Sequence, residues 1–519
     1  MTGDDARIST PRAILFLVVL NLAAHFIPFE RASLSPDDYY SLLKAGDLKS
    51  GSVLAMMAVY PERPISSAIV MLRSKLFADQ VRVPLALLFV LSSAVLLCVH
   101  ATFQILLHDQ RESLLASVVF CLLPNKLESY HASVNIFMNF AVVCYLLCLI
   151  LFLRAVHRDS LAIACGSALA YTIGLFSYEV GFFAPVVLLV WCLMYRRQGL
   201  KYVGILVVPA LSYSIYRVML LRATYEATHH TGFQLRPARD LFHHYAGAYL
   251  ARSVLYGGYE FFSIETPWLM LVVLADSMLL FGILRFRPRE FRPTDPRLLV
   301  LAVAMFACFL LPLFLQERGG IAGRHLMLPS LGVVLMLLPL LRRASMGHPG
   351  WWTAAVGAGL LVSQGNAWTH VVSCRINAAL YDSMRGMKGC LRAAEDVLVD
   401  VRSFRDAIPS GGIRFEHDFL NFYYGAQTFE DWSLRSMVRL ASGQNDKRVH
   451  IVVEGPIREG GMLSFVEAQG TGTGSRSLTR TPIVLEAAKA VTIDFESVYG
   501  DGFRNGTPRR PRAPSCEGS

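Results

Sequence analysis

Two adjacent carboxylates, Asp37 and Asp38, stand in the segment LSPDDYYSLLKAG, shortly after the first apolar run. Ser35 is a good N-cap and Pro36 a good first helical residue, so a helix is predicted to begin here with both acids in its first turn. Such a carboxylate could act as a general base toward an acceptor hydroxyl. Neighbours on a helix point about 100° apart, so only one of the two is expected to face a reaction. The simpler interpretation is that the acids only start the helix, where its dipole favours negative charge.

Three cationic residues are of the types that bind phosphate. Arg63 precedes a proline and an amphipathic stretch, whereas Arg324 and His325 follow a glycine-rich turn in QERGGIAGRHLMLPSLG. Arginine suits bidentate recognition of phosphate oxygens, which favours a phosphate-containing ligand near these residues. The competing interpretation is that they only anchor the chain at the headgroup level of a bilayer.

Two further acids occur in short turns between apolar runs: Glu128 in LPNKLESYHASVN and Glu179 in FSYEVGFFAP. An acid at hydrocarbon depth is costly and usually functional, whereas one in a turn outside the membrane costs far less. The sequence leaves open whether these acids shape a site or are solvated turn residues. No set of metal ligands is defined beside them, so neither a metal nor another cofactor is predicted.

The composition indicates which elements must position these residues. Of 519 residues, 54% are hydrophobic and 17% are charged, whereas a soluble domain carries roughly 25% charged residues. This balance excludes a disordered, collagenous or coiled-coil chain and argues against a wholly soluble protein. The net charge of +10 comes largely from short arginine clusters between apolar runs. That pattern sets membrane topology, so no nucleic-acid partner is expected.

The apolar runs predict an all-α polytopic membrane protein, because about 20 such residues cross a bilayer as a helix. Placing every arginine cluster in the cytoplasm requires a crossing at the short run 113–123 and two crossings within 160–195, with SYEVG (177–181) as their outer turn. The result is eleven spans, with a cytoplasmic N-terminus and an extracytoplasmic C-terminus. The spans are 13–29, 83–107, 113–123, 134–154, the pair within 160–195, 202–221, 267–284, 298–316, 327–341 and 350–365.

The long polar segments divide the chain into three predicted parts. Residues 1–365 form the transmembrane domain, whose outer loops 30–82 and 222–266 contain amphipathic helical stretches suited to the membrane surface. Residues 366–501 form a small extracytoplasmic α/β domain, and residues 502–519 a disordered tail rich in Arg, Pro and Gly.

Within the predicted α/β domain, a helical stretch near 376–400 precedes two β-like runs, HIVVEG (450–455) and AVTIDFE (490–496). Cys374 and Cys390 lie in this part of the chain and could pair if it is in an oxidising compartment.

Taken in order, these pieces resemble the GT-C superfamily of polytopic glycosyltransferases, and most closely its transmembrane O-mannosyltransferases that carry tetratricopeptide repeats. The resemblance covers about residues 10–380. Two departures are that Leu123 and Tyr178 replace a His and a Lys of the family, and that no repeats follow. The matching positions are Asp37 and Asp38; Arg63 and Pro64; Pro124 and Glu128; Ser177, Glu179 and Gly181; and Arg324, Leu326, Leu328, Pro329, Ser330 and Gly332.

The resemblance implies a GT-C-like fold and an inverting glycosyltransferase that uses a polyprenyl-phosphate-linked sugar on the extracytoplasmic face. It implies that Asp37 or Asp38 is the base and that Arg324, with His325 and Arg63, binds the donor phosphate. Glu128 and Glu179 would shape the site. The partners would be the lipid-linked sugar, a glycan, lipid or protein acceptor, and membrane lipid, and the expected location is a bacterial inner membrane.

Two other functions stay open at this point. A transporter or flippase of lipid-linked saccharides would need polar residues near the bilayer midplane, where Asp276 is the residue of interest. A catalytically inactive scaffold of the same fold would instead use its C-terminal part to bind a partner.

Overall fold

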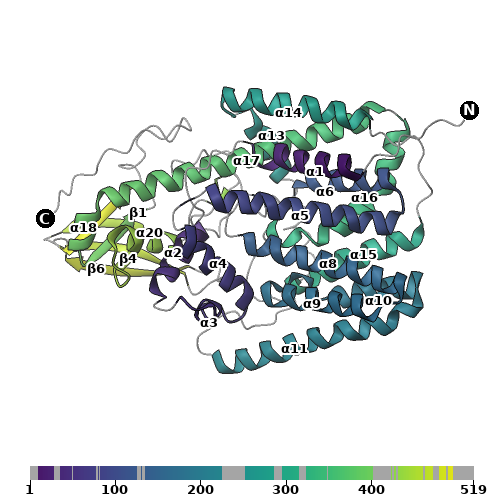
Figure 1. Cartoon of the computed structure of the whole chain (residues 1–519). Coiled ribbons are helices and arrows are strands. Elements are labelled where there is room, and N and C mark those ends of the chain that lie inside the picture. Colours follow the sequence, from purple (N-terminus) through teal and green to yellow (C-terminus); the bar gives the residue numbers. More distant parts are fainter. Residues whose placement is uncertain are drawn as a thin grey trace, which may run out of the picture.

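The computed structural model describes residues 10–27, 36–48, 51–77, 80, 82–124, 130, 135–224, 252–262, 264–285, 295–314, 323–347, 349–400, 422–423, 426–427, 431–459, 462–470, 478–486 and 489–494. These residues are mostly helical, and a mixed sheet lies near the C-terminus (Figure 1).

A helix forms at each of the eleven predicted apolar segments. Three of these helices, α5, α8 and α11, are long and apolar enough to cross a membrane by length and composition. The number of eleven crossings stays a prediction. The helices are α1 (Thr10–His25), α5 (Arg82–Leu107), α6 (Gln110–Leu122), α8 (Ile136–Arg158), α9 (Leu161–Ser177), α10 (Ala184–Tyr195), α11 (Leu200–Thr224), α14 (Thr266–Arg285), α15 (Pro296–Phe314), α16 (Pro329–Gly347) and α17 (Pro349–Gly386).

The predicted division of the region 160–195 into two helices is confirmed. Asp159 ends α8 in the left-handed conformation, at φ 49°, and Ser160 caps α9 by accepting a hydrogen bond from the backbone N–H of Ile163. Helix α9 ends at Ser177, and the 3-10 turn η3 (Glu179–Gly181) leads into α10. The turn at 177–181 is therefore a short, ordered connection between α9 and α10.

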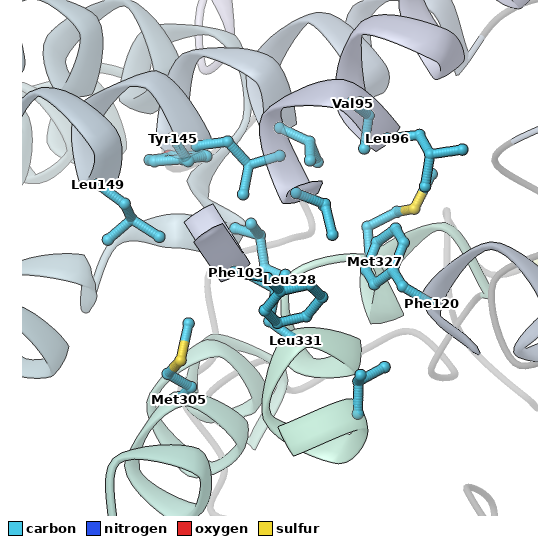
Figure 2. Close-up of a cluster of buried hydrophobic side chains, with 14 of the residues drawn as sticks. Val95, Leu96, Phe103, Phe120, Tyr145, Leu149, Met305, Met327, Leu328 and Leu331 are labelled. Atoms are coloured by element: carbon cyan, nitrogen blue, oxygen red, sulfur yellow. The ribbon is translucent and has the colours of Figure 1, made fainter. Parts of the chain in front are cut away.

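The bundle core is made of side chains from helices that are far apart in the sequence. Figure 2 shows side chains of α5, α6, α8 and α15 close to those of residues 327–331 at the start of α16. Met327, Leu328 and Leu331 are at most 1% exposed, and burying each such side chain stabilises the fold by about 1.5–3 kcal/mol. This packing anchors the segment that begins with the 3-10 turn η6 (Gly323–Leu326).

Three short helices occupy the first predicted outer loop: α2 (Pro36–Asp47), α3 (Val53–Met57) and α4 (Pro64–Phe77). Helix α4 packs against α8 and α9, and α2 packs against α4. In the second predicted outer loop, α13 (Arg252–Phe261) packs along α17. A Cβ atom at Gly365 would lie 1.8 Å from the carbonyl oxygen of Gly257, so these two helices approach closely only because both residues are glycines.

The C-terminal sheet has the strand order β6-β5-β4-β1-β7. Strand β1 (Asp396–Asp400) runs parallel to β4 (Arg448–Glu459) and β7 (Ala490–Asp494). On the other side of β4, β5 (Met462–Gly470) pairs antiparallel with β4, and β6 (Leu478–Glu486) pairs antiparallel with β5. The same part of the chain contains the helices α18 (Lys388–Ala393) and α20 (Asp431–Ser442). A separate pair of strands, β2 (Phe422–Tyr423) and β3 (Ala426–Gln427), is antiparallel.

One expectation for this region needs correction. The run 450–455 lies in β4, and β7 begins as predicted at 490, but residues 396–400 form β1 rather than the end of a helix. Val397, Leu398 and Val399 are fully buried, as is typical of a central parallel strand covered on both faces. Helix α17 runs unbroken through the expected boundary at 365/366. Cys390 is disulfide-bonded whereas Cys374 is a thiol, so the two do not pair.

Helix α2 shares its apolar core with the C-terminal sheet. Tyr39 of α2 is 2% exposed and belongs to one buried cluster with Met384 of α17, Val399 of β1 and Leu434 of α20. Figure 1 shows α2 between α4 and the sheet, and α17 running from the bundle to the sheet. The helix that carries the two predicted acids is therefore held by the C-terminal part of the chain.

Candidate functional site

A polar cluster joins the first predicted outer loop to the turn between α9 and α10. Arg63, just ahead of α4, donates two hydrogen bonds to Glu179: Nε to Oε2 at 2.9 Å and one terminal nitrogen to Oε1 at 2.6 Å. Its guanidinium also lies over the ring of Tyr178, 4.1 Å from the ring centroid. Because the pair is bidentate and stacked, it fixes the orientation of both side chains.

Tyr178 connects this pair to a third segment. Its hydroxyl lies 2.6 Å from Nε2 of His325 in η6, and the two rings are stacked at an angle of 17°. His325 is 8% exposed. Residues from three separately predicted segments thus meet, and we refer to Arg63, Tyr178, Glu179 and His325 as the Arg63 cluster.

The carboxylate of the Arg63 cluster is ionised. Burial raises the pKa of Glu179, but the Arg63 guanidinium outweighs this effect and lowers the pKa to about 2, so the carboxylate is charged at neutral pH. Arg217 of α11 also acts on Glu179, and it donates a hydrogen bond to the backbone carbonyl of Glu62 at 3.3 Å. Two guanidinium groups therefore act on the carboxylate of Glu179.

The turn that carries Glu179 is held in place by its backbone. Tyr145 of α8 donates a hydrogen bond to the carbonyl of Tyr178 at 2.6 Å, and Ser66 of α4 donates one to the carbonyl of Ser177. A Cβ atom at Gly181 would lie 2.4 Å from the ring of Tyr145, so only glycine fits. Ser177 and Gly181 therefore have structural roles in positioning Glu179.

The segment that carries His325 is held by packing. Leu326, Leu328 and Ser330 are buried, and the hydroxyl of Ser330 donates a hydrogen bond to the carbonyl of Leu326 at 2.6 Å. A Cβ atom at Gly332 would lie 2.4 Å from the carbonyl oxygen of Ala302 in α15. Most of the motif in 323–332 thus anchors this segment. Arg324 belongs to η6, but its side chain lies outside the described residues.

Asp38, one of the two predicted acids of α2, is paired with a different arginine. Asp38 is fully buried and forms an ion pair with Arg73 of α4, with its Oδ1 2.6 Å from a guanidinium nitrogen. Arg73 and Arg63 are ten residues apart, which corresponds to about 15 Å along a helix. The side chain of Asp37 and the whole of Glu128 lie outside the described residues. The structure therefore unites Arg63, Glu179 and His325 but gives Asp38 a separate partner.

Four residues near these sites were not singled out as candidates from the sequence: Arg73, Tyr178, Tyr213 and Arg217. Tyr178 was noted only as a departure from a family pattern, although it connects Arg63 to His325. A signal for Arg217 existed, because it is the only charged residue in the apolar run 202–221. Arg73 and Tyr213 carried no such signal, since both stand in ordinary amphipathic or apolar surroundings.

The described residues contain no group of three or more His, Cys, Asp and Glu side chains that could hold a metal ion. They define a mostly helical protein with three helices of membrane-spanning length and a polar cluster joining separate segments. Comparison of the sequence with models of known protein families found no match, and comparison with curated proteins found none either.

Proposed function

We propose that this protein is a membrane glycosyltransferase that moves a sugar from a polyprenyl-phosphate-linked donor to an acceptor hydroxyl on the extracytoplasmic face. The observation that carries the proposal is the Arg63 cluster. Three segments contact one another in it, through Arg63, Glu179, Tyr178 and His325. Each segment carries a predicted phosphate-binding or acidic residue and resembles a GT-C motif.

The contacts between helix ends support an eleven-span topology. At the predicted cytoplasmic ends, Arg342 of α16 lies 2.5 Å from Glu112 of α6 in a buried ion pair. Lys201 of α11 lies 2.5 Å from Asp159 at the end of α8. The hydroxyl of Tyr195 at the end of α10 donates to a carboxylate oxygen ahead of α15. Each contact joins two ends that the charge pattern assigns to the same side.

The predicted extracytoplasmic ends are joined in the same way. His25 at the end of α1 contacts the backbone carbonyl of Cys121 near the end of α6 at 3.0 Å. Arg375 of α17 forms an ion pair at 2.6 Å with Glu265, just before α14. The Arg63 cluster belongs to this side. The disulfide at Cys390 suits an oxidising compartment, which supports an extracytoplasmic C-terminal α/β part.

The proposed reaction is a direct displacement. The acceptor oxygen bonds to the anomeric carbon as the bond from that carbon to the phosphate oxygen breaks, and the phosphate leaves with the electron pair. Arg63 and His325, together with Arg324, would stabilise the charge that builds on the phosphate. The proton of the acceptor hydroxyl passes to a carboxylate, and the anomeric centre is inverted.

Asp37 is the preferred base of the two adjacent acids. Asp38 is buried against Arg73, whereas a general base must reach the proton that it removes. Asp37 precedes Asp38 in the same helix, and neighbouring positions of a helix are about 100° apart. In this proposal Asp38 holds α2 against α4, and Asp37 receives the proton.

The decisive experiment uses the purified full-length chain in nanodiscs. Mass spectrometry of the co-purified lipid is expected to find a polyprenyl phosphate or its sugar conjugate, and a transfer assay to find release of polyprenyl phosphate. Asp37→Asn is expected to lower transfer by at least about 10²-fold with normal folding, whereas Asp47→Asn at the other end of α2 is the matched control. Wild-type transfer by Asp37→Asn, Asp38→Asn and the double variant would refute the assignment of the base. Transbilayer movement of the lipid without sugar transfer would favour a flippase.

A further inference from the structure

One face of α11 presents two polar side chains to the Arg63 cluster. Tyr213 and Arg217 are four residues apart, so they lie on the same side of the helix. The phenol of Tyr213 is close enough to Glu179, Arg217 and Arg63 to interact electrostatically with all three. Helix α11 is also among the helices long and apolar enough to cross a membrane, where ionisable residues usually mark function.

Among the described residues, no group forms a hydrogen bond with the buried hydroxyl of Tyr213. The residue is 3% exposed, and the rings of Phe176 and Phe182 lie against it. A buried hydroxyl that makes no hydrogen bond destabilises the fold. The neighbouring Tyr171 and Tyr216, by contrast, each donate to a backbone carbonyl. Of these three tyrosines, Tyr213 alone keeps an unused hydroxyl donor.

Arg217 supplies the charge that a ligand of this hydroxyl would match. Arg63 makes a bidentate contact with Glu179, whereas Arg217 donates a hydrogen bond to a backbone carbonyl at 3.3 Å. Among the described residues, Arg217 thus has no bidentate carboxylate partner, and its guanidinium lies near the phenol of Tyr213. A group with several acceptor oxygens and a negative charge, such as phosphate, complements both.

We propose that Tyr213 and Arg217 of α11 bind the phosphate group of a lipid, beside Arg63. The choice of a polyprenyl phosphate as that lipid rests on the proposed function. The location near the end of an apolar helix favours a ligand whose tail remains among the helices while its phosphate reaches these two side chains.

Binding of undecaprenyl phosphate to the full-length chain in nanodiscs tests the proposal. Arg217→Met is expected to weaken binding by at least about tenfold, because it removes a charge-assisted contact, and Tyr213→Phe by about two- to tenfold. Tyr213→Phe is also expected to leave the melting temperature unchanged or higher, since the hydroxyl it removes has no partner. The matched controls are Lys201→Met and Tyr202→Phe at the other end of α11, and both should bind like the wild type.

Two further probes identify the ligand. Undecaprenol, which lacks the phosphate, is expected to bind the wild type and both variants equally, and inorganic phosphate alone is expected to bind far more weakly than the lipid. Equal binding of undecaprenyl phosphate by wild type, Tyr213→Phe and Arg217→Met would overturn the proposal, and inorganic phosphate binding as tightly as the lipid would overturn the lipid assignment.

The outcomes separate this inference from the proposed function. Lipid-phosphate binding that depends on Tyr213 and Arg217, in a protein that transfers no sugar, would support the inference and refute the glycosyltransferase. If both variants transferred sugar at the wild-type rate and bound the donor with wild-type affinity, the inference would be refuted and the glycosyltransferase supported.

Discussion

Two arginine–carboxylate pairs, one just ahead of α4 and one within it, lie in different surroundings. Just ahead of α4, Arg63 donates two hydrogen bonds to Glu179, and their side chains are 29% and 14% exposed. Farther along, Arg73 contacts Asp38, and these side chains are 5% and 0% exposed. The more accessible pair can exchange part of its contacts for a ligand, whereas the buried pair can only hold helices together. Proximity of an acid to a cation therefore does not by itself mark a site.

The largest effect is expected from breaking the buried pair. Arg73→Met leaves the Asp38 carboxylate buried without its cation, and such losses typically cost about 3–5 kcal/mol. Thermal unfolding of the purified protein should show a strongly lowered melting temperature. The double variant Arg73→Met with Asp38→Leu is expected to recover much of the loss, because no charge stays buried. A single variant that melts like the wild type would contradict the structural role of this pair.

A smaller effect is expected at the accessible pair. Glu179→Gln removes a charged partner of Arg63, and about 1–2 kcal/mol of stability should be lost, because the partly exposed guanidinium can be hydrated. The same change raises the positive charge of the cluster, so anion binding should become tighter. Measurements of the melting temperature and of undecaprenyl phosphate binding should show a lower stability together with a tighter binding. Weaker binding by the variant would contradict the prediction.

The pH dependence of this pair has a definite sign. The pKa of Glu179 is lowered from 4.5 to about 2 by Arg63, against the effect of burial. Its stabilisation is therefore complete above about pH 4.5 and is lost as the pH falls through about 2. The difference in melting temperature between wild type and Glu179→Gln should be constant near neutral pH and shrink below pH 4.5. A difference that grows on acidification would reverse this assignment.

The smallest effect is expected at the link between the accessible pair and η6. Tyr178→Phe removes the hydroxyl that lies 2.6 Å from His325 but keeps the ring beneath Arg63. A single hydrogen bond of this kind contributes about 1 kcal/mol, so a modest drop in melting temperature is expected. Tyr195→Phe, whose hydroxyl bond is longer and exposed, serves as the control and should change less.

The sequence predicted local structure better than it predicted partners. Apolar runs located eleven helices, since a hydrophobic segment of that length has few alternatives to a helix. The apolar pattern did not predict where α17 ends. This helix continues into polar sequence because α13 and the C-terminal part of the chain pack against it. Strand β1 was missed because five residues among helical neighbours carry too short a pattern.

The site was predicted residue by residue but not as pairs. Arg63, Glu179 and His325 were identified from type and position, yet their contacts join residues more than 100 positions apart. Nothing local distinguishes an arginine that pairs with Glu179 from one that pairs with Asp38. The burial of Asp38, which separates the two adjacent acids, depends on α4 and is visible only in three dimensions.

The shared core of α2 and the C-terminal sheet also governs the order of events during synthesis. Leu434, which covers α2, is made 395 residues after Tyr39, which takes about 20–80 s at ~5–20 residues per second. During this time the apolar face of α2 has neither α20 nor β1 to cover it. A nascent chain interrupted before α20 therefore leaves the apolar face of α2 uncovered. The packing of this early helix is completed only when the last third of the protein has been made.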